Sequence, residues 1–407
     1  MIHKKFYIVV LVALLLISSI PFTSYAASGT AAQDNAFIAE AQKLYYYESN
    51  RYARYIAYHH QYPKNAASSI VWWVNADIDK PAYNAPVAAK NPSSLTVLVN
   101  KQHYLSRSFT PAALAAVDSA RLMPEAANAV KTMKSAAAKD GAYIYARSNG
   151  YRSYATQRSM NSNTGTTQRA PDSSVARAGY SEHQTGLAVD LTRGKGNYSG
   201  ITYSSKEGTW LRNNSWKYGF IVRYTPANKS ITGYISEPWH VRYIGKAHAR
   251  LMHELGCASY EEYWVKYIAH APAGWVKAKT SWYYFAGGTM RLGWQKARDA
   301  WYYLDTADGA MKSGWQKINA KWYYLGAASD GEMRSGWQDI NGKRYYLGSA
   351  GDGAMKSGWQ SIDGERYYFG GANDGAMKFG WQTIGGVRYY FDPVSGANIP
   401  DFGIVAP

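Results

Sequence analysis

Residues 181–190 read Ser-Glu-His-Gln-Thr-Gly-Leu-Ala-Val-Asp, and this stretch, together with Glu-Pro-Trp-His at residues 237–240, decides the fold and the chemistry of the chain. Gly186 and the β-compatible Leu-Ala-Val run after it indicate a loop that leads into a strand. The chain must bring these two separate segments together for their polar side chains to converge. The sequence therefore predicts a site built on a strand, with contributions from distant parts of the chain.

The side chains of these two segments are of the types that bind a catalytic metal ion. His183, Asp190 and His240 can hold zinc from three sides and leave a fourth coordination position for water. Glu237 precedes the last histidine by three residues, in a turn made by Pro238, which places it as a general base or acid rather than as a ligand. The alternative is that the two histidines are ordinary structural residues.

A second candidate element reads Gly-Tyr-Arg-Ser-Tyr-Ala-Thr-Gln at residues 150–157. Arg152 can grip a carboxylate with two hydrogen bonds, or stabilise the oxyanion that forms at a reacting carbonyl. The alternative role for Arg152 is a surface salt bridge.

The elements around these motifs mix strands with helices and show no regular alternation of strand and helix, which favours an α+β domain with a small antiparallel sheet. The pattern predicts strands over 143–147, 187–192, 220–224 and 239–245, and helices over 125–139, 210–218, 247–256 and 260–269. It also predicts a long helix over 34–62, strands over 70–74 and 95–99, and a helix over 111–122.

The start of the chain resembles a secretory leader. Residues 1–26 combine a basic start, an apolar run and small residues before a cleavage point after Ala26. The alternative is that this segment stays as an uncleaved membrane anchor. No other apolar run of the chain reaches the length that spans a bilayer. We therefore expect a secreted protein with no stable membrane insertion once the leader is removed.

The composition narrows the choice of partner. The chain has 407 residues and a formal net charge of +17, so a polyanion is the expected partner. Secretion makes nucleic acid unlikely as that polyanion and favours the acidic polymers of a bacterial envelope. The single cysteine, Cys257, excludes both an intramolecular disulfide and a cysteine-based zinc site.

The last third of the chain is an internal repeat. Gly-Trp recurs with its tryptophan at 275, 294, 315, 337, 359 and 381, and a Tyr-Tyr pair follows each one. Each unit predicts one β-hairpin, and because one hairpin cannot bury its own apolar face, the hairpins must stack as a solenoid.

The aromatic side chains of the repeats are candidates for ligand binding. Tryptophan and tyrosine from adjacent hairpins can form a box that holds a quaternary ammonium group, or can stack on sugar rings. The alternative is that they only form the core of the solenoid. In the later units Arg344, Arg366 and Arg388 stand where the earlier ones have tryptophan, and a cation there disfavours a choline box. The candidate residues are Trp294, Trp315, Trp337, Trp359, Trp381, Tyr303 and Tyr324.

Residues from about 71 to about 264 resemble the VanY-type D-alanyl-D-alanine carboxypeptidases and the related L,D-carboxypeptidases, which are zinc peptidases of bacterial peptidoglycan. The matching pieces are residues 98–101, 150–157, 181–190, 218–224, 232–234 and 237–245. The resemblance implies that His183, Asp190 and His240 bind Zn²⁺ and that Glu237 is the catalytic base. It also implies that Arg152, Gln157 and Ser181 contact the terminal carboxylate or the reacting carbonyl of a stem peptide, and that Tyr224 and Trp239 line the pocket.

The repeats resemble the choline-binding and cell-wall-binding repeats of secreted Gram-positive proteins. We therefore expect a leader over 1–26, a helical segment over 27–69, an α+β zinc carboxypeptidase domain over 70–270 and an all-β hairpin-repeat solenoid over 271–407 that binds a choline-bearing or other teichoic acid, or a glycan. The bond cut, D,D or L,D, stays open. An endopeptidase and a non-catalytic wall-binding protein are the alternative functions.

Overall fold

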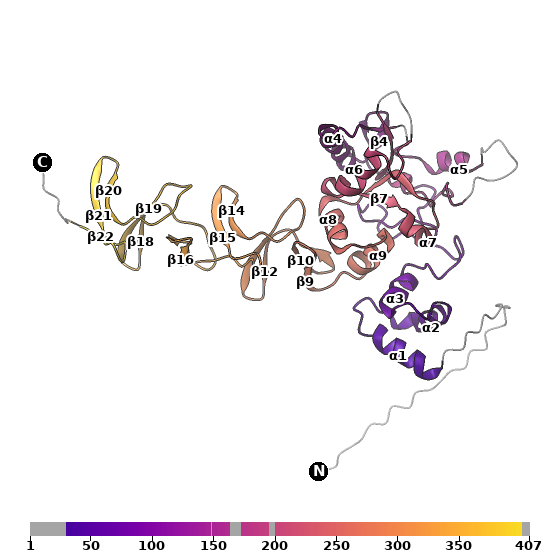
Figure 1. The fold of residues 1–407 in the computed structure, drawn as a ribbon, viewed down its shortest axis with the longest axis horizontal. Helices are drawn as coiled ribbons and strands as arrows, with labels where there is room; N and C mark the ends of the chain where they lie inside the picture. Colours follow the sequence, from indigo (N-terminus) through magenta and orange to yellow (C-terminus); the bar gives the residue numbers. More distant parts are fainter. Residues whose placement is uncertain (1–29, 148, 163–171, 195–199, 401–407) are drawn as a thin grey trace, which may run out of the picture. The chain divides into compact units, whose positions relative to one another are not determined.

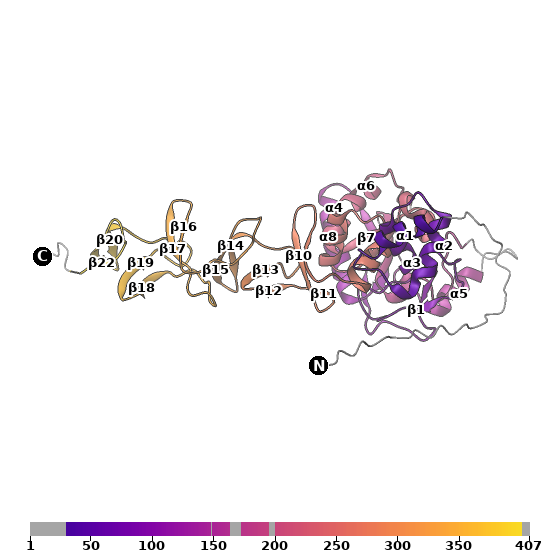
Figure 2. The same ribbon diagram turned by 90° about the horizontal axis from the view of Figure 1, so that it is seen from below.

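The computed structural model describes residues 30–147, 149–162, 172–194 and 200–400 (Figures 1 and 2). The predicted leader lies outside the described residues. Among those residues, no helix has the length and the apolar character needed to cross a bilayer. The chain divides into two compact units, one ending at Val71 and the other beginning at Trp72. The domain boundaries expected from the sequence stay predictions.

The first unit is a helical hairpin in place of the single long helix that was predicted over 34–62. Helix α1 (Ala31–Ala41) is followed by the short helix η1 (Ser49–Arg51) and by α2 (Tyr52–Gln61). The prediction is wrong because a continuous helix has no partner for its apolar face, whereas the fold-back brings Phe37 into a stack with His59, with ring centroids 4.1 Å apart. His60 Nε2 also lies 2.7 Å from Asp34 Oδ1.

The apolar run predicted as a strand over 70–74 is helical, because it lies in α3 (Ala67–Asn75). A short continuous apolar run has the same hydrophobicity in a buried strand and in a buried helix, so periodicity does not separate the two. Ile70, Val71 and Val74 are fully buried in this helix.

A four-stranded antiparallel sheet is the centre of the second unit. Its strands are β5 (Ile144–Ala146), β6 (Ala188–Arg193), β8 (Glu237–Tyr243) and β7 (Phe220–Tyr224), in that spatial order. The predicted α+β class with a small antiparallel sheet is confirmed.

The two faces of this sheet have different environments, because successive side chains of a strand point to opposite sides. Val189 and Leu191 of β6 and Val241 of β8 belong to a buried apolar cluster. The same cluster contains Ala126, Ala127, Val130, Met133 and Ala137 of helix α4 (Pro124–Lys139). The alternate residues of β6 and β8 point away from this core, and they include Asp190 and His240.

Shorter elements complete this part of the unit. The helices are α5 (Tyr154–Ser162), η2 (Glu182–Thr185), α6 (Lys206–Asn214), η3 (Ser215–Tyr218), η4 (Pro226–Asn228), α7 (Lys229–Thr232), α8 (Lys246–Leu255), α9 (Tyr260–Trp264) and η5 (Val265–Ala269). The strands are β1 (Val87–Ala88), β2 (His103–Tyr104), β3 (Ala115–Val117) and β4 (Ala120–Leu122).

Two further predictions for this part of the chain are wrong. The alanine-rich segment 111–122 was predicted to be helical, but it contains the β3–β4 hairpin. Asp118 lies in the turn of this hairpin with a φ of 50°, and its side chain accepts a hydrogen bond from the Ala146 amide. Residues 95–99 do not form a strand. The carbonyls of Leu95 and Val97 accept hydrogen bonds from the buried Arg242 guanidinium instead of from a neighbouring strand.

The predicted hairpin repeat is confirmed, one hairpin for each Gly-Trp unit. The hairpins are β9 (Gly274–Lys277) with β10 (Trp282–Ala286), β12 (Gly293–Ala297) with β13 (Ala300–Leu304), β14 (Gly314–Ile318) with β15 (Lys321–Leu325), β16 (Trp337–Ile340) with β17 (Lys343–Tyr346), β18 (Gly358–Ile362) with β19 (Glu365–Phe369), and β20 (Gly380–Ile384) with β21 (Val387–Phe391). The short strands β11 (Thr289–Met290) and β22 (Asn398–Ile399) pair with the first and the last hairpin.

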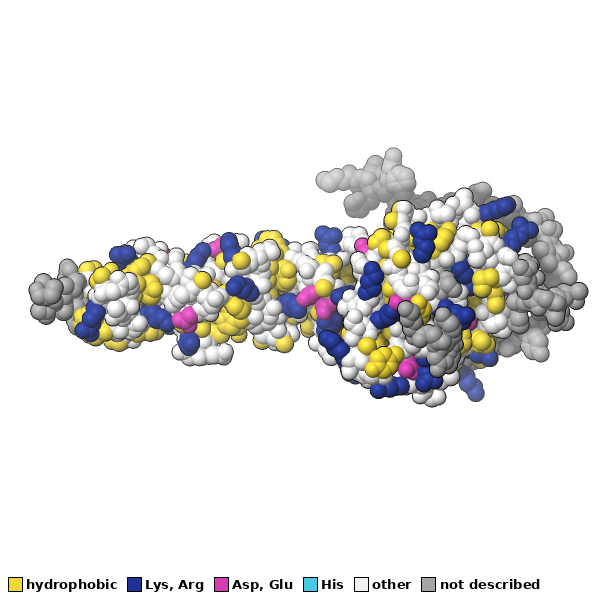
Figure 3. All heavy atoms as spheres, turned by 90° about the horizontal axis from the view of Figure 1, so that it is seen from above, with side chains coloured by type: hydrophobic (Ala, Val, Ile, Leu, Met, Phe, Trp, Pro, Cys, Tyr) yellow, Lys and Arg dark blue, Asp and Glu magenta, His cyan; other side chains and the backbone are white. Residues whose placement is uncertain are grey.

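Aromatic side chains and single backbone hydrogen bonds, such as that from the Met333 amide to the Trp301 carbonyl, join the repeat units in place of continuous sheet ladders. Trp294 of β12 lies 4.9 Å, centroid to centroid, from Tyr323 of the following hairpin, and Trp315 makes the equivalent contact with Tyr345. Hydrophobic and basic side chains lie next to each other along the repeat hairpins (Figure 3).

The first hairpin packs on the helices that end the sheet domain. Tyr283 and Phe285 of β10 are fully buried in one apolar cluster with Leu251 of α8 and Tyr263 of α9. Arg250 of α8 forms ion pairs with Glu254 and with Asp308 in the repeats. The start of the repeat array is therefore fixed to α8 and α9 by both apolar and ionic contacts.

We predict that His248 of α8 makes the stability of the protein fall in mild acid. Burial lowers the pKa of His248 to about 4, whereas its ordinary pKa is about 6.5. Between these two pH values the histidine is protonated in the unfolded chain and neutral in the folded chain, so acidification favours unfolding. The free energy of unfolding should drop by about 2 kcal/mol through this residue between pH 7 and pH 5.

Urea unfolding of the wild type and of His248→Gln at both pH values measures this contribution. Glutamine can still accept a hydrogen bond from the Tyr263 hydroxyl, which lies 2.8 Å from His248 Nδ1. The variant should lose about 2 kcal/mol less than the wild type on acidification, and an equal loss in both proteins would contradict the assignment.

Candidate active site

One cavity of about 210 Å³ in the second unit is lined by all the site residues that the sequence predicts for the carboxypeptidase domain. Nine predicted residues line it: Arg152, Gln157, Ser181, His183, Asp190, Tyr224, Glu237, Trp239 and His240. They come from α5 and the turn before it, from η2 and the residue before it, and from strands β6, β7 and β8.

Strand register explains why two of the candidate ligands meet. Asp190 of β6 and His240 of β8 are directly opposite each other in the antiparallel ladder, and cross-strand partners carry their side chains on the same face. His183 reaches the same point from η2, which ends at Gly186 in the left-handed conformation with a φ of 69°. A side chain at Gly186 would also crowd Leu114 and Pro111, so glycine fits this turn for two reasons.

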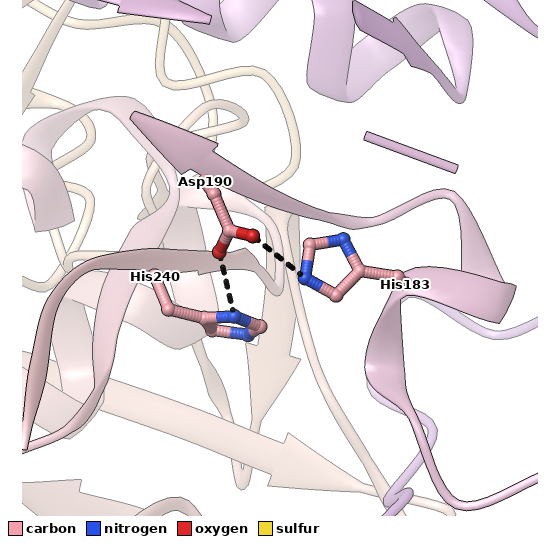
Figure 4. A group of neighbouring side chains, drawn as sticks. All are labelled: His183, Asp190 and His240. Atoms are coloured by element: carbon pink, nitrogen blue, oxygen red, sulfur yellow. Dashed lines mark hydrogen bonds and ion pairs between the residues drawn. The ribbon is translucent and has the colours of Figure 1, made fainter. Parts of the chain in front are cut away.

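The three candidate ligands form a compact triangle. His183 Nε2 lies 3.5 Å from Asp190 Oδ2, and His240 Nδ1 lies 3.1 Å from Asp190 Oδ1 (Figure 4). One ligand atom from each residue lies within 4.8 Å of the other two, which is the spacing that a single metal ion needs. Among the described residues, this is the one group of three or more such side chains that could hold a metal.

The hydrogen bonds behind the triangle select the nitrogen that each histidine presents. His183 Nδ1 lies 2.7 Å from the Gly150 carbonyl, which can only accept, so the proton is on Nδ1 and the lone pair is on Nε2. Nε2 is buried and has no hydrogen-bond partner among the described residues. His240 Nε2 lies 3.4 Å from Glu182 Oε2, which directs Nδ1 of His240 toward Asp190. The donor set therefore fits a metal ion bound by His183 Nε2, His240 Nδ1 and Asp190.

The charges of the site favour a cation at the centre of the triangle. Burial lowers the pKa of His183 to about 4, so this ring is neutral and can donate its lone pair. Burial would raise the pKa of Asp190, but His183 and His240 hold it well below its usual range. Burial would lower the pKa of His240, but hydrogen bonds to Asp190 and Glu182 raise it to about 9. The proton on His240 Nδ1 thus occupies the place that a metal cation would take, and metal binding would release it.

Glu237 has the position and the proton affinity of a general base. Its Oε2 lies 3.9 Å from His240 Nδ1, beside the triangle and not in it. Burial raises the pKa of Glu237 to about 7, against the opposing charges of His240 and Arg152. A carboxylate with a pKa near neutrality can accept a proton in one step and return it in the next.

Arg152 is the cation of the cavity that has no carboxylate partner. Among the described residues no acidic side chain pairs with it, and its Nε is buried without a hydrogen-bond partner. Burial lowers the pKa of Arg152, because removal from water destabilises the charged form of a guanidinium that has no carboxylate partner. Gln157 also has an unpartnered oxygen, Oε1, while its Nε2 donates to the Ala176 carbonyl at 2.8 Å. These two side chains can receive polar groups of a ligand.

Sequence reasoning missed the buried ion cluster beneath the metal site. Glu182 Oε1 accepts from Arg223 Nε at 2.9 Å and from Arg242 Nη1 at 3.1 Å, and Arg223 also pairs with Glu261 at 2.5 Å. All four side chains are almost fully buried. Burial would raise the pKa of Glu182, but the two arginines hold it well below its usual range. The sequence signal that could have indicated this cluster is a charged residue close to each of two predicted ligands, Glu182 beside His183 and Arg242 two residues after His240.

The cavity also contains residues that had no predicted role. Its remaining lining residues are Asn149, Met160, Ser174, Val175, Ala176, Glu182 and Tyr234. Tyr234 lies 4.8 Å from Tyr224 with the ring planes at 44°, and Tyr224 lies 5.0 Å from His240, all measured between ring centroids. These rings form the wall of the cavity behind His240.

The repeat candidates do not all lie where the sequence suggested. Tyr303 and Tyr324 are cross-strand partners of Trp294 and Trp315 within their own hairpins. The tyrosine that closes the space between hairpins is the preceding one, as at Tyr323, which lines a cavity of about 250 Å³ with Trp294. A pattern of adjacent tyrosines could not show which member faces the next unit.

Comparisons with known proteins match both parts of the chain. Residues 119–246 match the family described as VanY: D-alanyl-D-alanine carboxypeptidase. Residues 312–357 and 356–399 match the choline-binding repeat, and residues 273–287 and 293–311 match the "Putative cell wall binding repeat".

Individual carboxypeptidases are similar to part of this chain. The chain is 38% identical over 191 residues to "Putative carboxypeptidase YodJ" of Bacillus subtilis (strain 168), a match that covers 44% of this chain and 69% of that protein. It is 36% identical over 132 residues to a D-alanyl-D-alanine carboxypeptidase of Enterococcus faecium, covering 32% of this chain and 40% of that protein. A solved structure of the LdcB LD-carboxypeptidase is 36% identical and covers 44% of this chain and 89% of that chain, with a TM-score of 0.41.

We predict that the buried ion cluster depends on mutual neutralisation. Arg223→Met leaves Glu261 without its partner and should lower the free energy of unfolding by about 3–5 kcal/mol. Adding Glu261→Met removes the orphaned carboxylate and leaves the Glu182–Arg242 pair, so the double variant should recover much of this loss.

Urea unfolding of Arg223→Met, of Glu261→Met and of the double variant gives the coupling energy between these two side chains. Arg344→Met is the matched control, because the exposed Arg344–Asp339 pair should contribute at most about 1 kcal/mol. If the losses of the two single variants simply added, the cluster would not be a coupled unit.

Proposed function

We propose that this chain, which belongs to the VanY D-alanyl-D-alanine carboxypeptidase family, is a secreted zinc-dependent enzyme that removes the C-terminal D-alanine from peptidoglycan stem peptides. The repeats, which match cell-wall-binding families, would keep the enzyme on its polymeric substrate. The observation that carries the proposal is the convergence of His183, Asp190, His240 and the separate base Glu237 on one cavity.

His183 Nε2, His240 Nδ1 and Asp190 would hold the zinc ion, and zinc in such a site supplies a water of low pKa and polarises a carbonyl. Glu237 accepts a proton from the attacking water as the water oxygen bonds to the peptide carbonyl carbon. When the carbon–nitrogen bond breaks, Glu237 returns that proton to the departing amine of D-alanine. Its pKa of about 7 suits both transfers.

Recognition of a chain end requires a group that binds a free carboxylate. Arg152 is suited to this role because it lines the cavity, its Nε is buried there, and it has no carboxylate partner among the described residues. A terminal carboxylate would neutralise it, whereas an internal peptide bond would leave the guanidinium unpaired. This contrast favours a carboxypeptidase over an endopeptidase.

We predict that Glu237→Gln abolishes turnover but leaves the zinc site intact. Loss of the general base should lower kcat by about 10²- to 10⁴-fold. Mass spectrometry of pentapeptide and tetrapeptide stems should show loss of one D-alanine with the wild type, none with the variant, and none after treatment with a chelator.

The peptide that is consumed decides between D,D and L,D cleavage. Zinc content, measured by mass spectrometry of the native protein, should be equal in the wild type and in Glu237→Gln. Release of fragments larger than alanine would favour the endopeptidase, and no reaction together with no bound zinc would favour a binding protein without catalysis.

We predict that Arg152→Met removes the preference for a free C-terminus. For a peptide with a free carboxylate, kcat/KM should fall about 100-fold, because the carboxylate loses its charge partner. For the same peptide with a C-terminal amide, the variant and the wild type should differ little. Arg158→Met, on helix α5 that begins two residues after Arg152 and outside the cavity lining, is the matched control. A similar fall for both peptides would assign Arg152 to the reacting carbonyl or to the fold.

A further inference from the structure

The six repeat hairpins differ at one position that decides what lies against each Gly-Trp tryptophan. Seven residues after that tryptophan, the second strand of the hairpin carries Trp282, Trp301 or Trp322 in the first three hairpins. The last three hairpins carry Arg344, Arg366 or Arg388 there. The array therefore changes its chemistry halfway along its length.

The first three junctions between hairpins have three aromatic walls. At the second junction the rings of Trp294 and Trp301 are 6.5 Å apart at 86°, and Tyr323 of the next hairpin lies 4.9 Å from Trp294. These residues and Met333 line the 250 Å³ cavity. Asp352, which is paired with Lys356, lines it as well. Such a space suits a small cationic head group.

The first and third junctions repeat this geometry. Trp275 lies 6.5 Å from Trp282 and 4.7 Å from Tyr302. Trp315 lies 6.4 Å from Trp322 and 4.9 Å from Tyr345, all measured between ring centroids.

At the later positions a guanidinium replaces the third wall. The guanidinium carbon of Arg366 lies 4.3 Å from the ring centroid of Trp359, and that of Arg388 lies 4.4 Å from the ring centroid of Trp381. These are the distances of a cation stacked on an aromatic face. In the first half of the array the cations of the chain lie over the second tryptophan of the pair, with Lys277 Nζ 5.0 Å from the Trp282 centroid and Lys317 Nζ 5.8 Å from the Trp322 centroid. In the last two hairpins the cation covers the Gly-Trp ring itself.

The residue across the hairpin explains why Arg344 behaves differently. Arg344 faces Asp339 and forms two hydrogen bonds to its carboxylate, at 2.8 and 2.9 Å. Arg366 faces Ser361, and Arg388 faces Thr383, neither of which can neutralise a guanidinium. With no carboxylate opposite, the guanidinium takes the tryptophan face. The fourth junction thus carries Arg344, held by Asp339, at the position of the third wall, and Phe369, whose ring lies 5.9 Å from Trp337, is buried in the packing between hairpins. The fifth junction has its tryptophan face occupied.

We propose that Arg366 and Arg388 are built-in cations that occupy the aromatic faces of the last repeats, so that a quaternary ammonium ligand binds only at the first three junctions. This inference rests on the proposed wall-binding role of the repeats. A ligand cation at the fifth junction would have to displace Arg366 and remain beside its charge. A cation at the second junction meets aromatic walls, Met333 and a carboxylate that Lys356 already neutralises.

Equilibrium dialysis of the full chain against choline chloride tests the stoichiometry. The wild type should bind about three choline molecules per chain, and Trp301→Ala, which removes a wall of the second junction, should bind about two. Arg366→Trp rebuilds the third wall beside Trp359 and Tyr389, whose centroids lie 4.8 Å apart, and should bind about four.

Arg366→Ala is the matched control for Arg366→Trp, because it removes the cation without adding a ring beside Trp359. This variant should therefore stay at about three. Equal thermal unfolding curves of all variants show that their repeats are folded.

Five bound molecules in the wild type, none, or no gain in Arg366→Trp would each overturn the proposal. Sedimentation with purified cell walls and release of D-alanine are measured on the same samples. Wall binding without choline binding would overturn only this inference, whereas failure to sediment with walls would overturn the proposed role of the repeats.

Discussion

The buried carboxylate of Glu182 is the constraint on which the arrangement of the peptidase site depends. It pairs with Arg223 of β7 and Arg242 of β8, and it lies 3.4 Å from His240. A buried charge of this kind is tolerated only when its partners neutralise it, so η2 and the two strands must meet in one arrangement. Because His183 is the next residue after Glu182, the ion cluster that joins these elements also positions the first candidate ligand.

The sheet converts this constraint into a site with two separate environments. Val189 and Val241 point into the apolar core against α4, while Asp190 and His240, one residue away on each strand, point to the opposite face. The alternation of strand side chains thus separates stability from chemistry over a few ångströms. In the repeats the two functions are not separated, because Trp294 and Tyr323 both pack one hairpin on the next and line a cavity between them.

Much of the core of the site could be predicted because its residue types have few other uses together. His183, Asp190, His240 and Glu237 point to a metal centre from identity and spacing alone, and the resemblance to known peptidases added the residues that line the pocket. The errors in the fold came from segments whose composition suits more than one structure. Residues 70–74 are apolar enough for a strand or a buried helix, and residues 111–122 form a hairpin although alanine favours helices. Tertiary contacts decided both.

The sequence by itself determined the candidate metal ligands, the mixed helix and sheet class of the first part and the hairpin repeat of the second, because these follow from residue types and from periodicity. Only the tertiary structure decided that Asp190 and His240 are cross-strand partners, that Glu182 is neutralised by arginines from two strands, and that Arg366 lies on Trp359 while Arg344 turns to Asp339. The physical reason is that each of these features is a distance between side chains. Strand register and the competition of nearby charges set such distances, and neither is written in the local order of the residues.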